Sequence, residues 1–293
     1  MNFTILLTIS MMIWGISWTM GKIVSGYADS FVLLFWRYAI TTLCMIPIMF
    51  FLKVSWKITR ISLLFIITAA TINLLYGYFF LQGLKNGLAG AGGVLVTTIN
   101  PIINFAILSL AGKYHPKKKE LLGLLVGFLG GLIIISIWKF SLTEVLSLGN
   151  IYFLVASFVW AVNSINSQYA GKVINPILFS FYINSISVPI LYLFVYDKNF
   201  LAALEFGSEF WICMFYLAAL STALATTIYI IATSKLGSEK ASSFVFLVPA
   251  FAVLGSFFIL GEKPTWNSIL GGAIAILAVR MLHTKPHKKV EES

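Results

Sequence analysis

Long apolar blocks, separated by short charged stretches, fill the chain from end to end. A helix rises 1.5 Å per residue, so about 17–25 mostly apolar residues cross a hydrocarbon layer roughly 30 Å thick. Ten blocks meet or nearly meet this length, and Arg37 is the only charge inside any of them. The blocks are residues 1–21, 30–52, 61–84, 86–112, 121–138, 145–171, 173–196, 210–234, 241–261 and 264–279.

These blocks predict an all-α polytopic membrane protein with ten transmembrane helices. Strands of a membrane barrel alternate polar and apolar residues over about 10 positions, whereas these blocks are continuously apolar. The first block lacks a basic n-region, and no small-residue cleavage pattern precedes Lys22. We therefore expect it to be a span and not a secretory signal.

Basic residues are distributed unequally between alternate loops. With the N-terminus in the cytoplasm, fourteen basic residues lie on the cytoplasmic side, and five lie outside. An excess of Lys and Arg marks cytoplasmic loops. The pattern predicts a multi-pass protein of the bacterial cytoplasmic (inner) membrane with both termini cytoplasmic. The five outer residues are Lys22, Lys85, Lys139, Lys198 and Lys263.

The composition agrees with a membrane protein. Residues of the AVILMFWYC set make up 59% of the chain and charged residues 10%, against about 25% charged in a typical soluble domain. This excludes an ordinary soluble enzyme or nucleic-acid binder, and the partners we expect are the lipid bilayer and a small-molecule substrate. The net charge of +10 is a topology signal, although residues 117–119 are a candidate patch for anionic lipid.

No feature of the sequence indicates a metal or cofactor. Cys44 and Cys213 lie inside apolar blocks without a CxxC pattern or a neighbouring His, so we expect free buried thiols. The chain has no P-loop and no HExxH or GxSxG motif, so we expect neither ATP hydrolysis nor an enzyme. A channel or a structural scaffold remains an alternative.

Similar residues recur at an almost constant offset. Pro101 and Pro249 are 148 residues apart, as are Gly123 and Gly271. Trp14 and Trp160 are 146 apart, and Asn73 and Thr222 are 149 apart. The pattern predicts two five-helix repeats, residues 1–140 and 141–284, followed by a cytoplasmic tail at 285–293. Because five is odd, the repeats are inverted, as is typical of alternating-access carriers.

These residues resemble the EamA-type branch of the drug/metabolite transporter superfamily over residues 3–282. The resemblance rests on Trp14-Gly15 with Lys22, on Arg37, on the prolines, and on the 221–225 and 260–262 segments. It implies a secondary transporter of small organic solutes, most often amino acids or related metabolites. The alternative is a multidrug or cationic-compound exporter. Two positions depart from the family: Lys113 follows Gly112 in place of Glu, and Gln168 replaces a basic residue.

Polar and aromatic side chains recur every three or four positions within the blocks, so they share helix faces. In a membrane such side chains face protein or water. We predict a central cavity with aromatic walls and hydrogen-bonding groups. The alternatives are interhelical hydrogen bonds and interfacial aromatic belts. The predicted substrate-binding residues are Trp14, Ser17, Trp18, Asn73, Tyr76, Asn100, Trp160, Asn163, Tyr182, Thr222 and Tyr229.

Five further residues are candidates for a role in transport. Arg37 and Lys22 are predicted to attract a carboxylate in an outer vestibule; the alternative is binding to helix-end carbonyls or lipid phosphate. Pro101 and Pro249 are predicted hinges, or static kinks. No Asp or Glu lies in any block, so we predict facilitated exchange or uniport, with any coupling through Glu262. We expect a monomer or weak homodimer.

Overall fold

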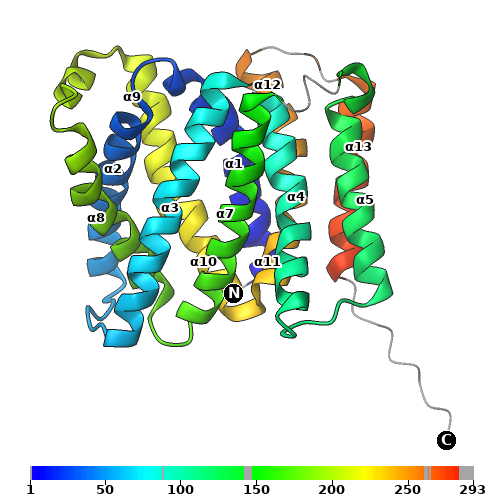
Figure 1. The fold of residues 1–293 in the computed structure, drawn as a ribbon, viewed down its shortest axis with the longest axis horizontal. Helices are drawn as coiled ribbons and strands as arrows, with labels where there is room; N and C mark the ends of the chain where they lie inside the picture. Colours follow the sequence, from blue (N-terminus) through cyan, green and yellow to red (C-terminus); the bar gives the residue numbers. More distant parts are fainter. Residues whose placement is uncertain (1, 88, 142–146, 261–262, 264, 284–293) are drawn as a thin grey trace, which may run out of the picture.

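The computed structural model describes residues 2–87, 89–141, 147–260, 263 and 265–283, and every regular element in these ranges is helical. Glu262 and the tail at 285–293 lie outside the described residues. Figure 1 shows the helices side by side as one bundle, with most of their axes close to parallel. The prediction of an all-α protein is therefore confirmed over the part of the chain that the structure describes.

The first half of the chain forms five helices and a short 3₁₀ turn. They are α1 (Phe3–Ser25), α2 (Ser30–Phe51), α3 (Arg60–Asn86), α4 (Ala89–Leu110), α5 (Lys118–Ile134) and η1 (Ile137–Lys139).

The second half is more finely divided. It contains α7 (Leu148–Ala170), α8 (Pro176–Val195), η2 (Phe200–Glu205), α9 (Ser208–Phe215), η3 (Tyr216–Thr226), α10 (Thr227–Leu236), α11 (Ser238–Ser243), η4 (Phe244–Leu247), α12 (Val248–Leu260) and α13 (Trp266–His283).

Eight stretches of the described residues are long and apolar enough to cross a membrane. Two of them join several elements: Ser208–Leu236 runs through α9, η3 and α10, and Ser238–Ile259 runs through α11, η4 and α12. The helices α5, which has 17 residues, and α7 are not among the eight, although both lie alongside the others in Figure 1. The structure thus supports a multi-span membrane protein.

Side-chain caps define several helix starts. Asn2, Asp29 and Asn175 each accept hydrogen bonds from backbone N–H groups in the first turn of the helix that follows. Thr59 and Ser62 form a reciprocal capping box at the start of α3. Because the first N–H groups of a helix have no intrahelical partner, these caps place the helix starts at particular residues.

Glycines allow two pairs of helices to approach closely, α1 with α12 and α5 with α13. A Cβ on Gly15 of α1 would lie 2.6 Å from Cβ of Phe251 and 2.8 Å from the backbone N of Ala252 on α12. On the other side of the bundle, α5 and α13 pack together, and a Cβ on Gly130 would lie 3.0 Å from the carbonyl oxygen of Gly271. Small residues therefore set both helix contacts.

We expect Gly15→Ala to lower the thermal stability of the purified protein by about 1–3 kcal/mol, because the new methyl group meets backbone that has no room to move. The matched control is Gly26→Ala, where the nearest heavy atom is a carbonyl oxygen at 3.7 Å. Thermal unfolding in detergent measures both variants. Equal melting temperatures would show that α1 and α12 are less closely packed than described.

Candidate functional site

A cavity lined by aromatic and polar side chains lies between the helices of the two halves of the chain. The empty space among these side chains, part of which is open to solvent, measures about 630 Å³. Its walls come from α1, α2, α3, α4, α7, η3, η4 and α12. The lining residues are Trp14, Ser17, Trp18, Arg37, Tyr38, Asn73, Tyr76, Phe80, Val96, Thr97, Asn100, Trp160, Ser221, Thr222, Thr226, Val245 and Val248.

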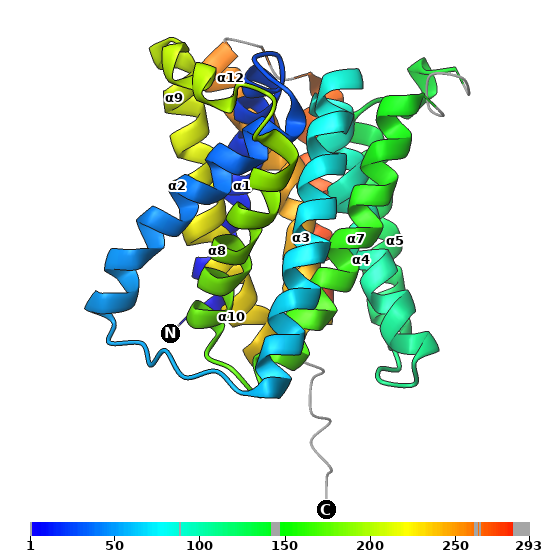
Figure 2. The same ribbon diagram turned by 60° about the vertical axis from the view of Figure 1, so that its left-hand side comes forward.

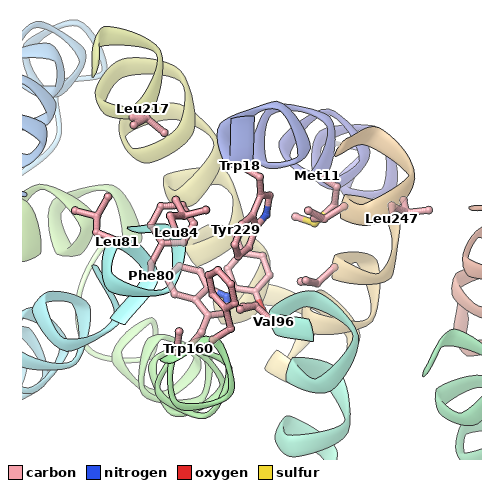
Figure 3. Close-up of a cluster of buried hydrophobic side chains, with 14 of the residues drawn as sticks. Met11, Trp18, Phe80, Leu81, Leu84, Val96, Trp160, Leu217, Tyr229 and Leu247 are labelled. Atoms are coloured by element: carbon pink, nitrogen blue, oxygen red, sulfur yellow. The ribbon is translucent and has the colours of Figure 1, made fainter. Parts of the chain in front are cut away.

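Aromatic rings from four helices pack together at this cavity, and three of them line it. Trp14 of α1 and Trp160 of α7 meet edge to face with their centroids 5.3 Å apart. The ring centroid of Tyr76 lies 4.7 Å from that of Trp160, and the ring centroid of Tyr229 lies 5.0 Å from that of Trp14. Figure 3 shows Trp18, Trp160 and Tyr229 converging from separate helices. Such rings supply a large apolar surface at low conformational cost.

Arg37 brings a positive charge to the cavity. Its Nε–H donates a hydrogen bond to the Thr222 hydroxyl at 3.0 Å, and its Cζ lies 5.8 Å from the Phe80 ring centroid. No Asp or Glu is among the described residues that line the cavity, and none forms an ion pair with Arg37 in the described ranges. The guanidinium charge is therefore not balanced by a carboxylate in this site.

One residue of the lining, Asn100, carries a buried hydrogen-bond acceptor without a partner among the described residues. Asn100 is fully buried, and its Nδ2 donates to the carbonyl oxygen of Ser157 at 3.2 Å. Its Oδ1 has no hydrogen-bond partner among the described residues. A buried polar atom without a partner is costly, so a ligand N–H or O–H would be stabilised at this position.

A π-helix shapes the wall that carries Thr222. The η3 segment has a π-helical backbone, and the hydroxyls of Thr222 and Thr226 donate to carbonyl oxygens five residues earlier, at 2.8 and 3.0 Å. Trp14 Nε1 donates to the Ser221 carbonyl oxygen at 3.3 Å. The π-helical segment η3 thus binds Trp14 of the aromatic wall through the Ser221 carbonyl oxygen and binds Arg37 through the Thr222 hydroxyl. Such π segments occur frequently at functional sites.

The structure brings most of the predicted substrate-binding residues to this cavity. Trp14, Ser17, Trp18, Asn73, Tyr76, Asn100, Trp160 and Thr222 all line it. Tyr229 does not line it, but its ring packs on the lining residues Trp14 and Trp160, and its hydroxyl lies 3.0 Å from that of Ser164.

Three other predicted residues lie elsewhere. Tyr182 belongs to α8, which lies at the left edge in Figure 1 and in front after the turn in Figure 2. At this peripheral position it packs against a separate apolar cluster. Asn163 is buried but is not part of the lining. Lys22 donates to the carbonyl oxygens of Leu84 and Gly87 at 2.5 and 2.9 Å, so its ammonium caps the end of α3.

Sequence reasoning did not single out every lining residue. Tyr38 follows Arg37 on α2 and donates to the carbonyl oxygen of Asn73 at 3.1 Å. Val96, Val245 and Val248 complete the walls. Tyr38 was recognisable as a polar aromatic residue next to the charge, whereas no polar signal distinguishes the three valines.

The two mid-block prolines have different surroundings. Pro101 lies inside α4, which continues through it as an α-helix. Pro249 is the second residue of α12, which follows the 3₁₀ turn η4 directly. Backbone irregularity therefore accompanies only the second proline, and the hinge role of both residues stays a prediction. Glu262, the predicted coupling residue, lies outside the described residues.

Two side-chain contacts join the loops at the end of the bundle where α1 ends. The Tyr27 hydroxyl donates to Glu209 at 2.8 Å, and this hydrogen bond raises the pKa of Tyr27. Lys198 and Asp29 form an ion pair at 3.2 Å. Both are exposed, so each contributes little to stability, but they connect the α1–α2 loop with the α8–α9 region.

A helical bundle with membrane-spanning helices around an aromatic and polar cavity is the architecture expected of a membrane transporter. The EamA-like transporter family matches residues 2–136 and 147–284, and the chain belongs to this family. An uncharacterized transporter of Archaeoglobus fulgidus is 26% identical over 97% of this chain and 98% of its own length. The uncharacterized transporter YyaM of Bacillus subtilis is 22% identical over 90% and 88%.

A solved crystal structure has the same fold. Its TM-score against this chain is 0.75, with 15% sequence identity and coverage of 96% of each chain. At this identity the similarity concerns the fold alone.

We expect Thr222→Val to destabilise the protein by about 1–3 kcal/mol, because the Arg37 Nε–H loses its acceptor. Thr222→Ser keeps the hydroxyl and serves as the matched control, with stability close to the parent. Thermal unfolding compares the two variants. If valine and serine have the same effect, the hydrogen bond to Arg37 has no structural role.

Proposed function

We propose that this transporter is an alternating-access secondary carrier for amino acids or closely related metabolites that bear a carboxylate. The observation that carries the proposal is the Arg37 guanidinium, which faces the cavity without an acidic partner in the described lining. A charge in a low-dielectric site is expensive unless it is paired. A solute carboxylate would supply the missing charge and form charge-assisted hydrogen bonds.

The rest of the cavity supports the same class of solute. The unpartnered Oδ1 of Asn100 favours a ligand that carries an N–H donor, as an amino group does. The rings of Trp14, Tyr76 and Trp160 offer an apolar surface for a side chain. One anion site, one acceptor and an apolar wall together match the three parts of an amino acid.

Residues in equivalent positions of the two proposed repeats meet at the cavity. Trp14 and Trp160 are in ring contact, and Asn73 and Thr222 both line the site. The family matches the chain twice, once in each half. These observations support ten spans arranged as two inverted five-helix repeats, 1–140 and 141–284, with substrate bound between them. The loop charges support cytoplasmic termini in the bacterial inner membrane.

The alternative substrate class is cationic drugs. A cation would require a carboxylate in the cavity, and the described lining residues include none. Arg37 would also repel it at short range. The charge of the site therefore favours anionic or zwitterionic solutes over cationic compounds.

We expect Arg37→Gln to weaken amino-acid binding tenfold or more, since charge-assisted hydrogen bonds contribute about 1.5–3 kcal/mol. The control is Lys22→Gln, which removes a positive charge that is held by carbonyl groups and is not part of the lining. Its binding should stay close to the parent value, although its stability should fall. Ligand-induced thermal shift and counterflow in proteoliposomes measure binding and exchange. Equal losses in the two variants would contradict a specific role for Arg37.

A further inference from the structure

A buried carboxylate lies outside the cavity, at the end of the bundle where α1 begins and α13 ends, here called the inner end. Glu239 occupies the first turn of α11 and is 8% exposed. From the sequence, residues 235–240 looked like a charged cytoplasmic loop. Instead α10 ends at Leu236, Gly237 turns the chain with φ +95°, and α11 starts at once. The turn carries Glu239 into the packed end of the bundle.

The Glu239 carboxylate has no cationic partner there. No ion pair to it occurs among the described residues, and the only hydrogen bond that another side chain makes to Glu239 reaches its backbone oxygen, from Ser242. Both carboxylate oxygens lie against Gly237, so that a Cβ at this glycine would overlap them. The neighbouring hydroxyl of Ser238 is also buried without a partner.

The surrounding charged groups are engaged elsewhere or face water. Lys235 and Lys240 are exposed. Glu120 accepts hydrogen bonds from the Tyr114 hydroxyl and the Lys117 N–H, both at 2.7 Å, and His283 Nε2 lies 2.6 Å from the Ser243 hydroxyl. The titratable or charged groups on elements packed against α11, or directly beside them, are Lys113, Tyr114, His115, Glu120, Tyr152, Tyr169, Lys172, Tyr229, Lys235, Lys240, Arg280 and His283.

One face of α7 connects this carboxylate with the cavity. Trp160 lines the cavity, Ser164 bonds Tyr229, and the Gln168 Oε1 accepts a hydrogen bond from the Ser238 N–H at 2.9 Å. Each of these residues is four positions from the next, so Gln168 lies eight residues, or roughly 12 Å along the helix, from Trp160. Ser242, Ser243 and Phe246 are also buried in this region. The Gln168–Ser238 hydrogen bond thus holds α11 against α7 at this end of the bundle.

We propose that Glu239 is a proton-binding site that keeps the inner end closed while it is protonated, an inference that rests on the proposed carrier function. A buried carboxylate without an ion-pair partner favours its neutral form, because ionisation away from water is costly. When α11 separates from α7, water reaches the carboxylate. The carboxyl then releases its proton to water on that side. Protonation thus stabilises the closed inner end and deprotonation stabilises the open one.

The test measures the accessibility of a single cysteine, so that it does not depend on knowing the solute. Ser242→Cys is introduced into a Cys44→Ser, Cys213→Ser background, and the protein is placed in nanodiscs. Its alkylation by a membrane-impermeant maleimide is followed between about pH 5.5 and about pH 8.5, a range in which buried carboxyls titrate. The Glu239→Gln variant, neutral at every pH, corrects for the ionisation of the thiol itself.

With Glu239 present, we expect alkylation at high pH to exceed that of the Glu239→Gln variant by about fivefold or more, the lower range of typical coupling between sites. At low pH the two should agree. Glu120→Gln should keep the parent response, and Glu239→Asp should keep a pH response with a displaced midpoint. Identical pH profiles with Glu and Gln at position 239 would overturn the proposal.

Counterflow on the same proteins separates this proposal from the proposed function. If no amino acid is exchanged but alkylation depends on Glu239, the substrate assignment fails and the proton site stands. If amino acids are exchanged, but the pH profiles of the parent and of the Glu239→Gln variant are the same, the proposed carrier function is supported and the proposed proton site is contradicted. The Glu239→Gln variant should elute from size-exclusion chromatography as a single folded species. This result, together with a retained pH response in the Glu239→Asp variant, excludes misfolding as the cause of a lost pH response.

Discussion

The organisation of the cavity depends on a single requirement: the charge of Arg37 needs a partner inside a membrane protein. The hydrocarbon layer offers no hydrogen-bonding group, and the described lining supplies only the Thr222 hydroxyl and the face of Phe80. Thr222 in turn belongs to a π-helix that also binds Trp14 through a carbonyl oxygen. The second half of the chain thus holds the cation that the first half contributes. We infer that the substrate completes this arrangement with its own negative charge.

Much of the fold follows from where charged residues interrupt the apolar blocks. All eight candidate spans overlap predicted blocks, because a helix in lipid needs an uninterrupted apolar length. The spacing rule also identified eight residues that line the cavity, since residues three or four apart share a helix face. Helical periodicity is a local property, and it is therefore visible in the sequence.

Other features depend on how the helices are arranged, which local periodicity does not specify. Tyr182 has the same polar and aromatic character as Tyr76, but α8 lies at the periphery and α3 beside the cavity. The sequence indicates a vestibule charge at Lys22, but it does not show that the end of α3 places two carbonyl groups beside the Lys22 ammonium. The π-helical backbone of η3 has no known signal in its sequence. Glu239 looked like a loop residue because charged neighbours surround it, and only the tight turn at Gly237 buries it.

The central claim is that a carboxylate-bearing solute binds between the two halves with its anionic group on Arg37. The most direct measurement is an experimental structure of the protein with the amino acid that stabilises it most in a thermal-shift screen. The account predicts the ligand carboxylate within hydrogen-bonding distance of Arg37, its amino group toward Asn100 Oδ1, and its side chain against Trp14 and Trp160. A ligand bound elsewhere, or in this cavity with its carboxylate directed away from Arg37, would contradict the account.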